Sequence, residues 1–248
     1  LGVKAASRNP SDKIAVIAID KQSIDNIGRW PWPRDVHAKM TDILSNAKAK
    51  TIGYTAFFFE PQVDAGLSYI NKLNETFAAS RFKGSKEADI EKLETLLTEA
   101  AAALNTDQRL AESFKKANNV LLPIVFQQFP FEPQGNPDKP VPENIVANSI
   151  LSKEKNADNL PPPGINPGYP IAELAASAVG FGHLNAQQDV DVASRVEPLM
   201  VRYYDRFFPS LSLMLAAKTM NLEVADIQFK LGEEVSVGKK RIRTDPEL

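Results

Sequence analysis

The stretch of sequence that decides the fold is an apolar run in the middle of the chain, Asn119-Val120-Leu121-Leu122-Pro123-Ile124-Val125-Phe126. An uninterrupted apolar run of this length, rich in branched side chains, is typical of a β-strand that is buried on both faces. The residues before it, 107–117, suit a helix. Together they predict one helix-strand unit of an α/β sheet.

Two earlier segments repeat this pattern. Residues 13–20 form a short branched run that ends at a carboxylate, residues 36–48 have apolar side chains at helical spacing, and residues 50–59 form a second apolar run. Strand, helix and strand at this spacing predict a parallel pair with a right-handed crossover. The expected fold class is therefore α/β, with three layers: a mostly parallel sheet that has helices on both faces.

The rest of the chain is predicted to complete one domain, residues 1–248. Residues 63–106 have the composition of one or two added helices, and the proline-rich residues 129–170 suggest an extended surface loop with a short helix near 145–151. An antiparallel portion should follow. Its expected elements are a helix at 171–178, strands at 179–185 and 195–204, a turn at 205–206, a helix at 210–220 and a polar hairpin at 228–243.

Composition excludes several classes of function. The 31 acidic and 29 basic residues nearly cancel and no basic stripe is present, so nucleic-acid binding is not expected. The chain has no cysteine and only two histidines, His37 and His183, which argues against disulfides, thiol chemistry and a histidine-rich metal site. No apolar run approaches the roughly 20 residues of a membrane-spanning helix, so we expect a soluble piece. It begins with Leu1-Gly2-Val3-Lys4, without the charged start and apolar core of a signal peptide, so we expect a segment excised from a longer protein.

Candidate ligand-binding residues lie where parallel strands are expected to end. Gly28-Arg29-Trp30-Pro31-Trp32-Pro33-Arg34 places Trp30, Trp32 and Arg34 in one rigid loop. Asp20, Glu60 and Asp189 follow predicted strands, and such strand ends meet at the edge of a sheet where ligands bind. We therefore predict one ligand cleft lined by these side chains. The alternatives that the loop simply packs over the next helix, and that Asp20 caps a helix, remain open.

Catalytic motifs are missing from the sequence. There is no Gly-x-Ser-x-Gly elbow, no phosphate loop and no dinucleotide glycine fingerprint after the first predicted strand. Asp189-Val190-Asp191 lacks the later glycine and glutamate of a calcium loop. We expect His183 to be a structural histidine whose hydrogen bonds are satisfied, and we expect neither an enzyme activity nor a cofactor or bound metal.

Several short motifs follow one another along the chain. They are Ile17-Ala18-Ile19-Asp20, Gly28 to Arg34 with His37, Phe58-Phe59-Glu60-Pro61, Asp107-x-Arg109-Leu110-Ala111 with Asn119-Val120-Leu121, Gly180-Phe181-Gly182-His183-Leu184-Asn185 with Asp189 and Asp191, and Tyr204 to Leu213. In this order they resemble the motifs of the type-2 CHASE domain, a sensory module of bacterial signalling proteins, and they cover most of the chain except residues 63–106 and 130–168. Thr55, Gln62 and Val192 stand where that family usually has Asp, Asp and Gly, and the family pattern usually runs on past Ile242.

The resemblance implies an input domain on the periplasmic or extracellular face of the bacterial inner membrane, anchored by flanking helices outside this chain. It would bind an unknown small-molecule ligand and would control an adenylate or diguanylate cyclase or a sensor kinase. A homodimer is one of the assemblies expected for it. Two alternatives stay open. One is a periplasmic metal-dependent hydrolase that uses Asp20 and Glu60, and the other is a ligand-free dimerisation module.

Overall fold

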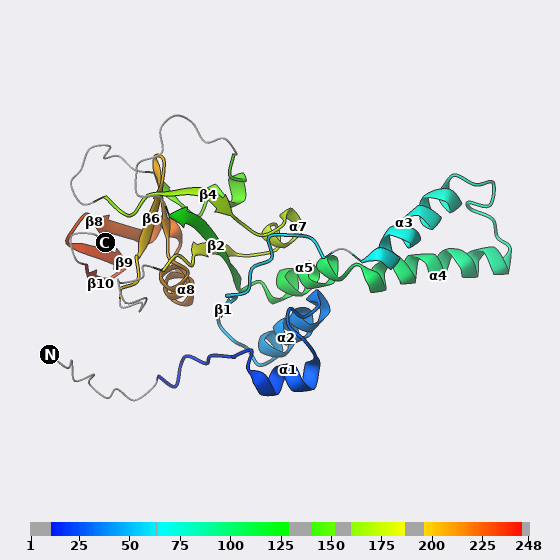
Figure 1. Cartoon of the computed structure of the whole chain (residues 1–248), viewed down its shortest axis with the longest axis horizontal. Coiled ribbons are helices and arrows are strands. Elements are labelled where there is room, and N and C mark those ends of the chain that lie inside the picture. Colours follow the sequence, from blue (N-terminus) through cyan, green and yellow to red (C-terminus); the bar gives the residue numbers. More distant parts are fainter. Residues whose placement is uncertain (1–10, 63, 129–139, 152–159, 187–195, 245–248) are drawn as a thin grey trace. The chain divides into compact units, whose positions relative to one another are not determined.

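The computed structural model describes residues 11–62, 64–128, 140–151, 160–186 and 196–244 (Figure 1). The chain divides into two units, residues 1–32 and 33–248, and each is considered by itself. The structure is mixed α/β, as the sequence predicts.

In the first unit the expected strand at residues 13–20 is wrong. These residues have no regular secondary structure and pair with no other strand in the described part of the chain. An apolar run supplies β-propensity, but a strand also needs a partner for its backbone N–H and C=O groups, and the sequence does not name one. The unit's one described helix, α1, runs over Lys21–Ile27 and begins directly after Asp20.

The second unit is built around β2, Val120–Gln128, which confirms the strand expected at 119–126. This strand pairs in parallel with β1, Ile52–Gly53, on one side and with β5, Gly180–His183, on the other. The strand expected at 50–59 is thus reduced to two residues. Strand β4, Gly164–Gly168, pairs with the later part of β2 in the antiparallel direction, so the sheet is mixed.

The side chains of β2 divide between two hydrophobic clusters, as the alternation of a strand requires. Val120, Leu122, Ile124 and Phe126 belong to one cluster, and Leu121 belongs to the other. The first cluster is shared with helices α2, Arg34–Asn46, α5, Thr106–Ala117, and α7, Ala172–Ala175. The second is shared with α8, Leu211–Thr219. Helices α2, α5 and α8 confirm the helices expected at 36–48, 107–117 and 210–220. The complete three-layer arrangement stays a prediction.

The region expected to be an extended loop, residues 129–170, is partly ordered into elements. These are the short helix α6, Glu143–Val146, the strand β3, Ile150–Leu151, and strand β4. Pro167 has no backbone N–H to donate, but it does not prevent β4 from pairing, because a strand at the edge of a sheet needs hydrogen bonds on one side only. The loop expectation is therefore wrong for β3 and β4, whereas α6 overlaps the start of the short helix expected near 145–151.

Two antiparallel sheets complete the C-terminal half. Strand β7, Arg206–Pro209, pairs with β3 and with β6, Met200–Tyr203. After the short 3-10 helix Val224–Asp226, the strands β8, Ile227–Lys230, β9, Glu234–Val237, and β10, Lys240–Arg243, form a three-stranded meander. The sequence predicted only a two-stranded hairpin there, whereas a second turn at Gly238, whose φ is +56°, separates β9 from β10.

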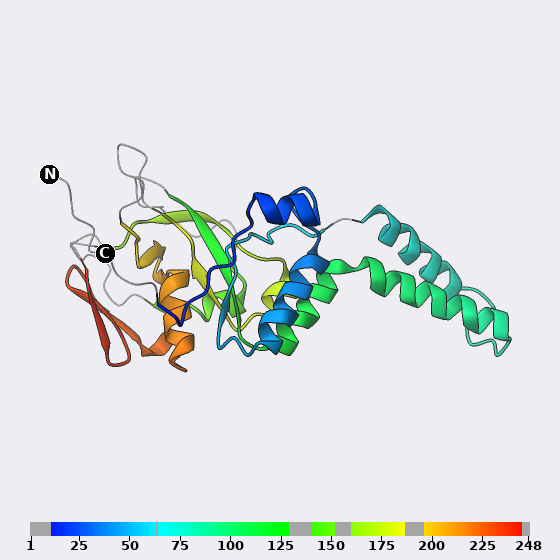
Figure 2. The same ribbon diagram turned by 90° about the horizontal axis from the view of Figure 1, so that it is seen from below.

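The predicted helical insert is a pair of antiparallel helices. Helices α3, Ala65–Ala78, and α4, Ala88–Leu104, lie side by side in both ribbon views (Figures 1 and 2). Asp64 caps α3, because its Oδ1 accepts the backbone N–H of Leu67 at 3.0 Å. Neither helix contains a fully buried residue. The pair therefore contributes little to the core described above.

Candidate functional site

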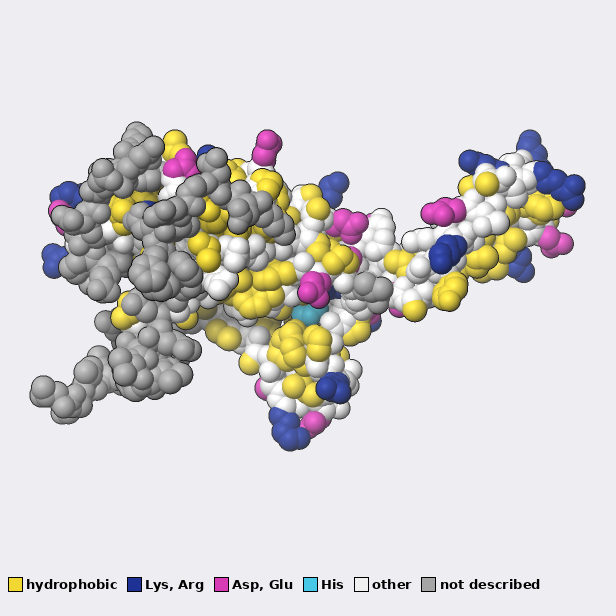
Figure 3. All heavy atoms as spheres, turned by 45° about the horizontal axis from the view of Figure 1, so that its top comes forward, with side chains coloured by type: hydrophobic (Ala, Val, Ile, Leu, Met, Phe, Trp, Pro, Cys, Tyr) yellow, Lys and Arg dark blue, Asp and Glu magenta, His cyan; other side chains and the backbone are white. Residues whose placement is uncertain are grey.

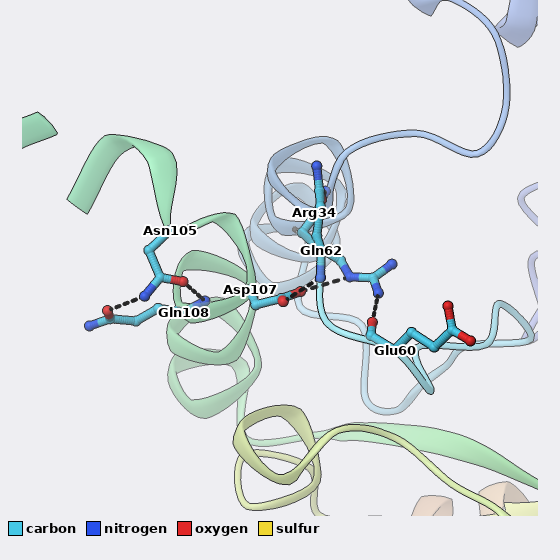
Figure 4. A network of polar contacts seen from close by, with 6 residues as sticks. All are labelled: Arg34, Glu60, Gln62, Asn105, Asp107 and Gln108. Carbon is cyan, nitrogen blue, oxygen red and sulfur yellow. Dashed lines mark hydrogen bonds and ion pairs between the residues drawn. The ribbon is translucent and has the colours of Figure 1, made fainter. Parts of the chain in front are cut away.

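A network of polar contacts in the second unit centres on Arg34, the first residue of α2. Its Nε donates to Oδ1 of Asp107 at 2.9 Å, and its Nη2 donates to the backbone oxygen of Glu60 at 2.8 Å (Figure 4). The guanidinium carbon also lies 4.6 Å from the centre of the Phe58 ring. Arginine suits this position because its planar group donates in several directions while stacking on an aromatic face.

Gln62 closes the network from the other side. Its side-chain oxygen accepts the backbone N–H of Arg34 at 2.8 Å, and its own backbone N–H donates to Oδ2 of Asp107 at 2.7 Å. Both oxygens of the Asp107 carboxylate are thus occupied, and the residue is buried in the first turn of α5. The network joins three segments that are distant in sequence: the start of α2, the loop after β1, and the start of α5.

An aromatic cluster lies under this network. The rings of His37 and Phe58 are 5.2 Å apart, and Tyr54 packs against both Phe58 and Phe114. Burial, with a smaller contribution from the positive charge of Arg34, lowers the pKa of His37 to about 4. Burial likewise raises the pKa of Tyr54 to about 12. Both rings are therefore neutral at physiological pH and serve as packing groups rather than as an acid or a base.

The carboxylate of Glu60 takes no part in the network. It is the backbone oxygen of this residue that Arg34 contacts, and the side chain is exposed and extends away from Asp107 (Figure 4). The two predicted site residues of the second unit, Arg34 and Glu60, are thus adjacent. Their charged groups have different surroundings, because only Glu60 presents its charge to solvent.

In the first unit the predicted site residues make local contacts. Oδ1 of Asp20 accepts the backbone N–H of Ser23 at 2.8 Å and its hydroxyl at 2.6 Å, which is the geometry of a helix cap. The side-chain hydrogen bond from Ser23, followed by the backbone one, lowers the pKa of Asp20. The rings of Trp30 and Trp32 meet edge to face with centroids 5.5 Å apart, and Nε1 of Trp32 donates to the oxygen of Gly28 at 2.7 Å. The tryptophan loop is therefore internally braced.

Two predicted site positions, Asp189 and Asp191, lie outside the described residues. The shared ligand cleft consequently stays a prediction. Among the described residues, no three histidine, aspartate or glutamate side chains lie close enough to hold one metal ion.

Asp107 and Gln62 were missed as network residues by sequence reasoning. Asp107 appears in the sequence as an acidic residue in the first turn of a helix, where its charge also favours the helix dipole. The sequence does not show that the Asp107 side chain is buried, and this burial is what distinguishes it from an ordinary surface carboxylate. Gln62 departs from the usual family residue, so the motif gave no reason to select it.

The Gly-Phe-Gly-His-Leu-Asn motif at 180–185 connects β5 with its neighbours. A Cβ atom on Gly182 would lie 2.5 Å from Cα of Leu211, so a side chain there would collide with the first turn of α8. Asn185 binds the backbone of Phe126 twice, accepting its N–H at 3.0 Å and donating to its oxygen at 2.6 Å. These motif residues therefore hold α8 and β2 against β5.

His183 is almost completely buried in the same motif, and burial lowers its pKa to about 3. Its Nδ1 accepts the backbone N–H of Asn185 at 3.3 Å, whereas its Nε2 has no hydrogen-bond partner among the described residues. The expectation of a structural histidine fits this burial. The expectation of satisfied hydrogen bonds is met at Nδ1 and is not met at Nε2 within the described part of the chain.

A depression of about 260 Å³ lies between α2 and α5. Charged side chains of both signs line it, among them Lys39, Asp42, Arg109 and Lys116. It is open to solvent and shallow, unlike the enclosed apolar pockets that bind small molecules. No helix among the described residues is long and apolar enough to cross a bilayer.

These features define a class: a mixed α/β domain whose motif residues hold helices against a central strand. Comparison with protein families agrees with the resemblance. A family model described as the CHASE2 domain matches residues 3–247, so the chain belongs to the CHASE2 family. CHASE2 domains are extracellular sensory domains of signalling proteins and are not catalytic. Neither a search of curated proteins nor a search of solved structures found a match.

Proposed function

We propose that this domain is the ligand-sensing input of a membrane-bound bacterial signalling protein, with a cyclase or a kinase as its output. The observation that carries the proposal is the CHASE2 match over residues 3–247, which leaves almost none of the chain for another kind of domain. The ligand is a small molecule, and the residues proposed to bind it are Asp20, Trp30, Trp32, Arg34, Glu60 and Asp189.

The chemistry of the described residues supports sensing rather than turnover. Arg34 and Asp107 neutralise one another, while His37 and Tyr54 are buried and neutral. His37 and Tyr54 do not transfer protons at neutral pH, because their pKa values of about 4 and about 12 lie far from it. The exposed carboxylate of Glu60, by contrast, is available to a polar or cationic ligand.

The Arg34 network offers a route by which binding could reach the rest of the domain. Arg34 is the first residue of α2, and Glu60 and Gln62 lie on one loop. A ligand that binds the Glu60 side chain would displace this loop, and the loop contacts the starts of both α2 and α5. Binding near Glu60 is therefore expected to shift two core helices together.

Placement across the membrane can be tested with single cysteines, because the domain has none of its own. Glu60→Cys in the full-length protein places a thiol at an exposed position, and a membrane-impermeant maleimide should label it in intact spheroplasts. Leu122→Cys is the matched control, since that side chain is fully buried and should stay unlabelled until the protein is denatured. Labelling of Glu60→Cys only after membrane lysis would contradict an extracytoplasmic position.

The input role is tested by the output. Cyclic-nucleotide synthesis or autophosphorylation should be measured in membrane vesicles that contain the full-length protein or its Glu60→Gln variant. We expect removal of the Glu60 charge to change the dependence of the output on a small-molecule extract of the growth medium. An output that is indifferent to deletion of residues 3–247 would overturn the proposed role.

A further inference from the structure

The pair of helices α3 and α4 presents one long apolar face. In α3, the partly buried residues are Leu67, Ile70, Asn74 and Phe77, and Nδ2 of Asn74 donates to the backbone oxygen of Leu97 in α4 at 3.4 Å. Tyr69 and Leu73 lie one turn apart on the flank next to this stripe, and they are 69% and 53% exposed. An exposed aromatic beside an exposed leucine at helical spacing is characteristic of a face that packs against another element.

Helix α4 has a matching flank. Its partly buried stripe consists of Ile90, Leu97, Ala100, Ala101 and Leu104. Leu93 and Leu96, which are 48% and 52% exposed, lie about a quarter turn to one side of this stripe, followed by the exposed Ala103 along the helix. In α3, Tyr69 and Leu73 are offset from the partly buried stripe in the same rotational sense about the helix axis as Leu93 and Leu96 are in α4. Because the helices are antiparallel, both flanks point to the same side of the pair.

The opposite side is polar. Glu91, Glu94 and Thr98 line a shallow depression on α4, and Asn71 and Glu75 lie on the corresponding flank of α3. Hydrophobic side chains gather along the pair in the space-filling view (Figure 3). The two helices thus have one apolar side and one acidic side, although they enclose no core of their own.

We propose that the apolar face, defined by Tyr69, Leu73, Leu93 and Leu96, binds the same face of a second copy of this chain. Two such pairs stacked on a two-fold axis form a four-helix bundle, in which each copy supplies half of the core. A lone pair of 14- and 17-residue helices without a buried residue is poorly stabilised, since helices of this length depend on packing. A second copy supplies that packing.

The exposed area is sufficient for a dimer. Four large side chains, each about half exposed, present roughly 100 Å² apiece, and the alanines and Leu97 between them add to this. Burying both copies of the face therefore removes about 1,000 Å² from solvent, which is the lower limit for a specific interface. We expect a weak to moderate dimer rather than an obligate one. This inference is independent of ligand sensing, since none of the proposed ligand-binding residues lies on these helices.

The association can be measured by analytical ultracentrifugation of the purified chain from micromolar to millimolar concentration. We expect a reversible monomer-dimer equilibrium. The double substitution Leu93→Glu and Leu96→Glu should weaken it at least tenfold, because each glutamate would have to be buried opposite apolar side chains. The matched control, Asn71→Glu with Thr98→Glu, adds the same two negative charges on the polar side and should leave the dimer intact.

Two further measurements separate loss of contact from loss of folding. At low micromolar concentration, where both proteins are monomeric, circular dichroism and urea unfolding of the double variant should match the wild type, since both leucines are already half exposed in the single copy. Leu96→Cys should form an intermolecular disulfide under mild oxidation, whereas Thr98→Cys should not. A chain that is monomeric at millimolar concentration, or a dimer that survives Leu93→Glu with Leu96→Glu, would overturn the proposal. Binding of the monomer to anionic lipid vesicles through the same leucines would assign the face to a membrane surface instead.

Discussion

Nε of Arg34 donates to Oδ1 of Asp107 at 2.9 Å, and this ion pair joins the first turns of α2 and α5. The two side chains are only 14% and 9% exposed. A pair so little exposed is costly to break from one side, because the remaining charge loses its partner without regaining water. The Arg-Trp-Pro-Trp-Pro-Arg motif thus ends in a residue that organises the helices.

Asp107→Ala is expected to destabilise the domain by about 3 kcal/mol, because it removes the acceptor of Arg34 Nε and of the Gln62 backbone N–H and leaves the Arg34 charge without its partner. Urea unfolding followed by circular dichroism measures this loss. The matched control is Glu60→Gln, whose exposed carboxylate lies outside the network and whose change should be within about 0.5 kcal/mol. Equal effects of the two substitutions would show that the ion pair has no special structural role.

Gly182→Ala is expected to destabilise the domain by about 2 kcal/mol or more, since the new methyl group overlaps the backbone of Leu211. Backbone cannot move aside as a side chain does. Gly180→Ala is the comparison, because a Cβ there meets only the Asn148 side chain, at 3.1 Å, and Leu121 at ordinary contact distance. In thermal unfolding, the melting temperature of Gly182→Ala should lie well below that of Gly180→Ala. The reverse order would contradict close packing of α8 on β5.

Stability should fall as the pH is lowered below about 6.5. The pKa of His183 is about 3 in the folded chain and near 6.5 when unfolded, so the unfolded state binds more protons between these values. The stability that neutral His183 provides is therefore complete above pH 6.5 and declines as the pH falls. From pH 7 to pH 5 this residue alone should account for about 2 kcal/mol.

Urea unfolding at a series of pH values checks this dependence by comparing the wild type with the His183→Asn variant, whose asparagine does not titrate. His37, with a lowered pKa of about 4, acts in the same direction and should remain in the variant. The slope of unfolding free energy against pH should therefore be reduced but not abolished. An unchanged slope would mean that His183 is accessible to protons in the folded chain.

Removal of the α3–α4 pair should leave the remaining domain folded. A Cβ on Gly66 would lie 3.3 Å from the Leu104 side chain, which shows that the two ends of the pair are close together. Replacing residues 65–104 by a short Gly-Ser linker is thus expected to change the unfolding free energy of the remainder by less than about 1 kcal/mol. The helical signal should drop while the unfolding transition stays cooperative, and a broad transition would show that the core depends on these helices.

Long amphipathic or apolar segments were predicted correctly from the sequence. The periodicity of residues 36–48 and 107–117 reflects which side of each helix is buried, and α2 and α5 occupy these positions. The apolar run at 119–126 became β2 because it combines branched residues with partners on both sides. The similar run at 13–20 did not form a strand, since the described chain gives it no partner.

The sequence by itself determined the family, the mixed α/β class and the identity of the motif residues. These depend on side-chain types and on their spacing along the chain, which are local properties. Only the tertiary structure decided what those residues contact: Arg34 with Asp107 across 73 positions, Gly182 with the backbone of α8, and Asn185 with Phe126. The physical reason is that burial and hydrogen-bond partners arise from segments that are distant in sequence, so the pattern of one segment cannot specify them.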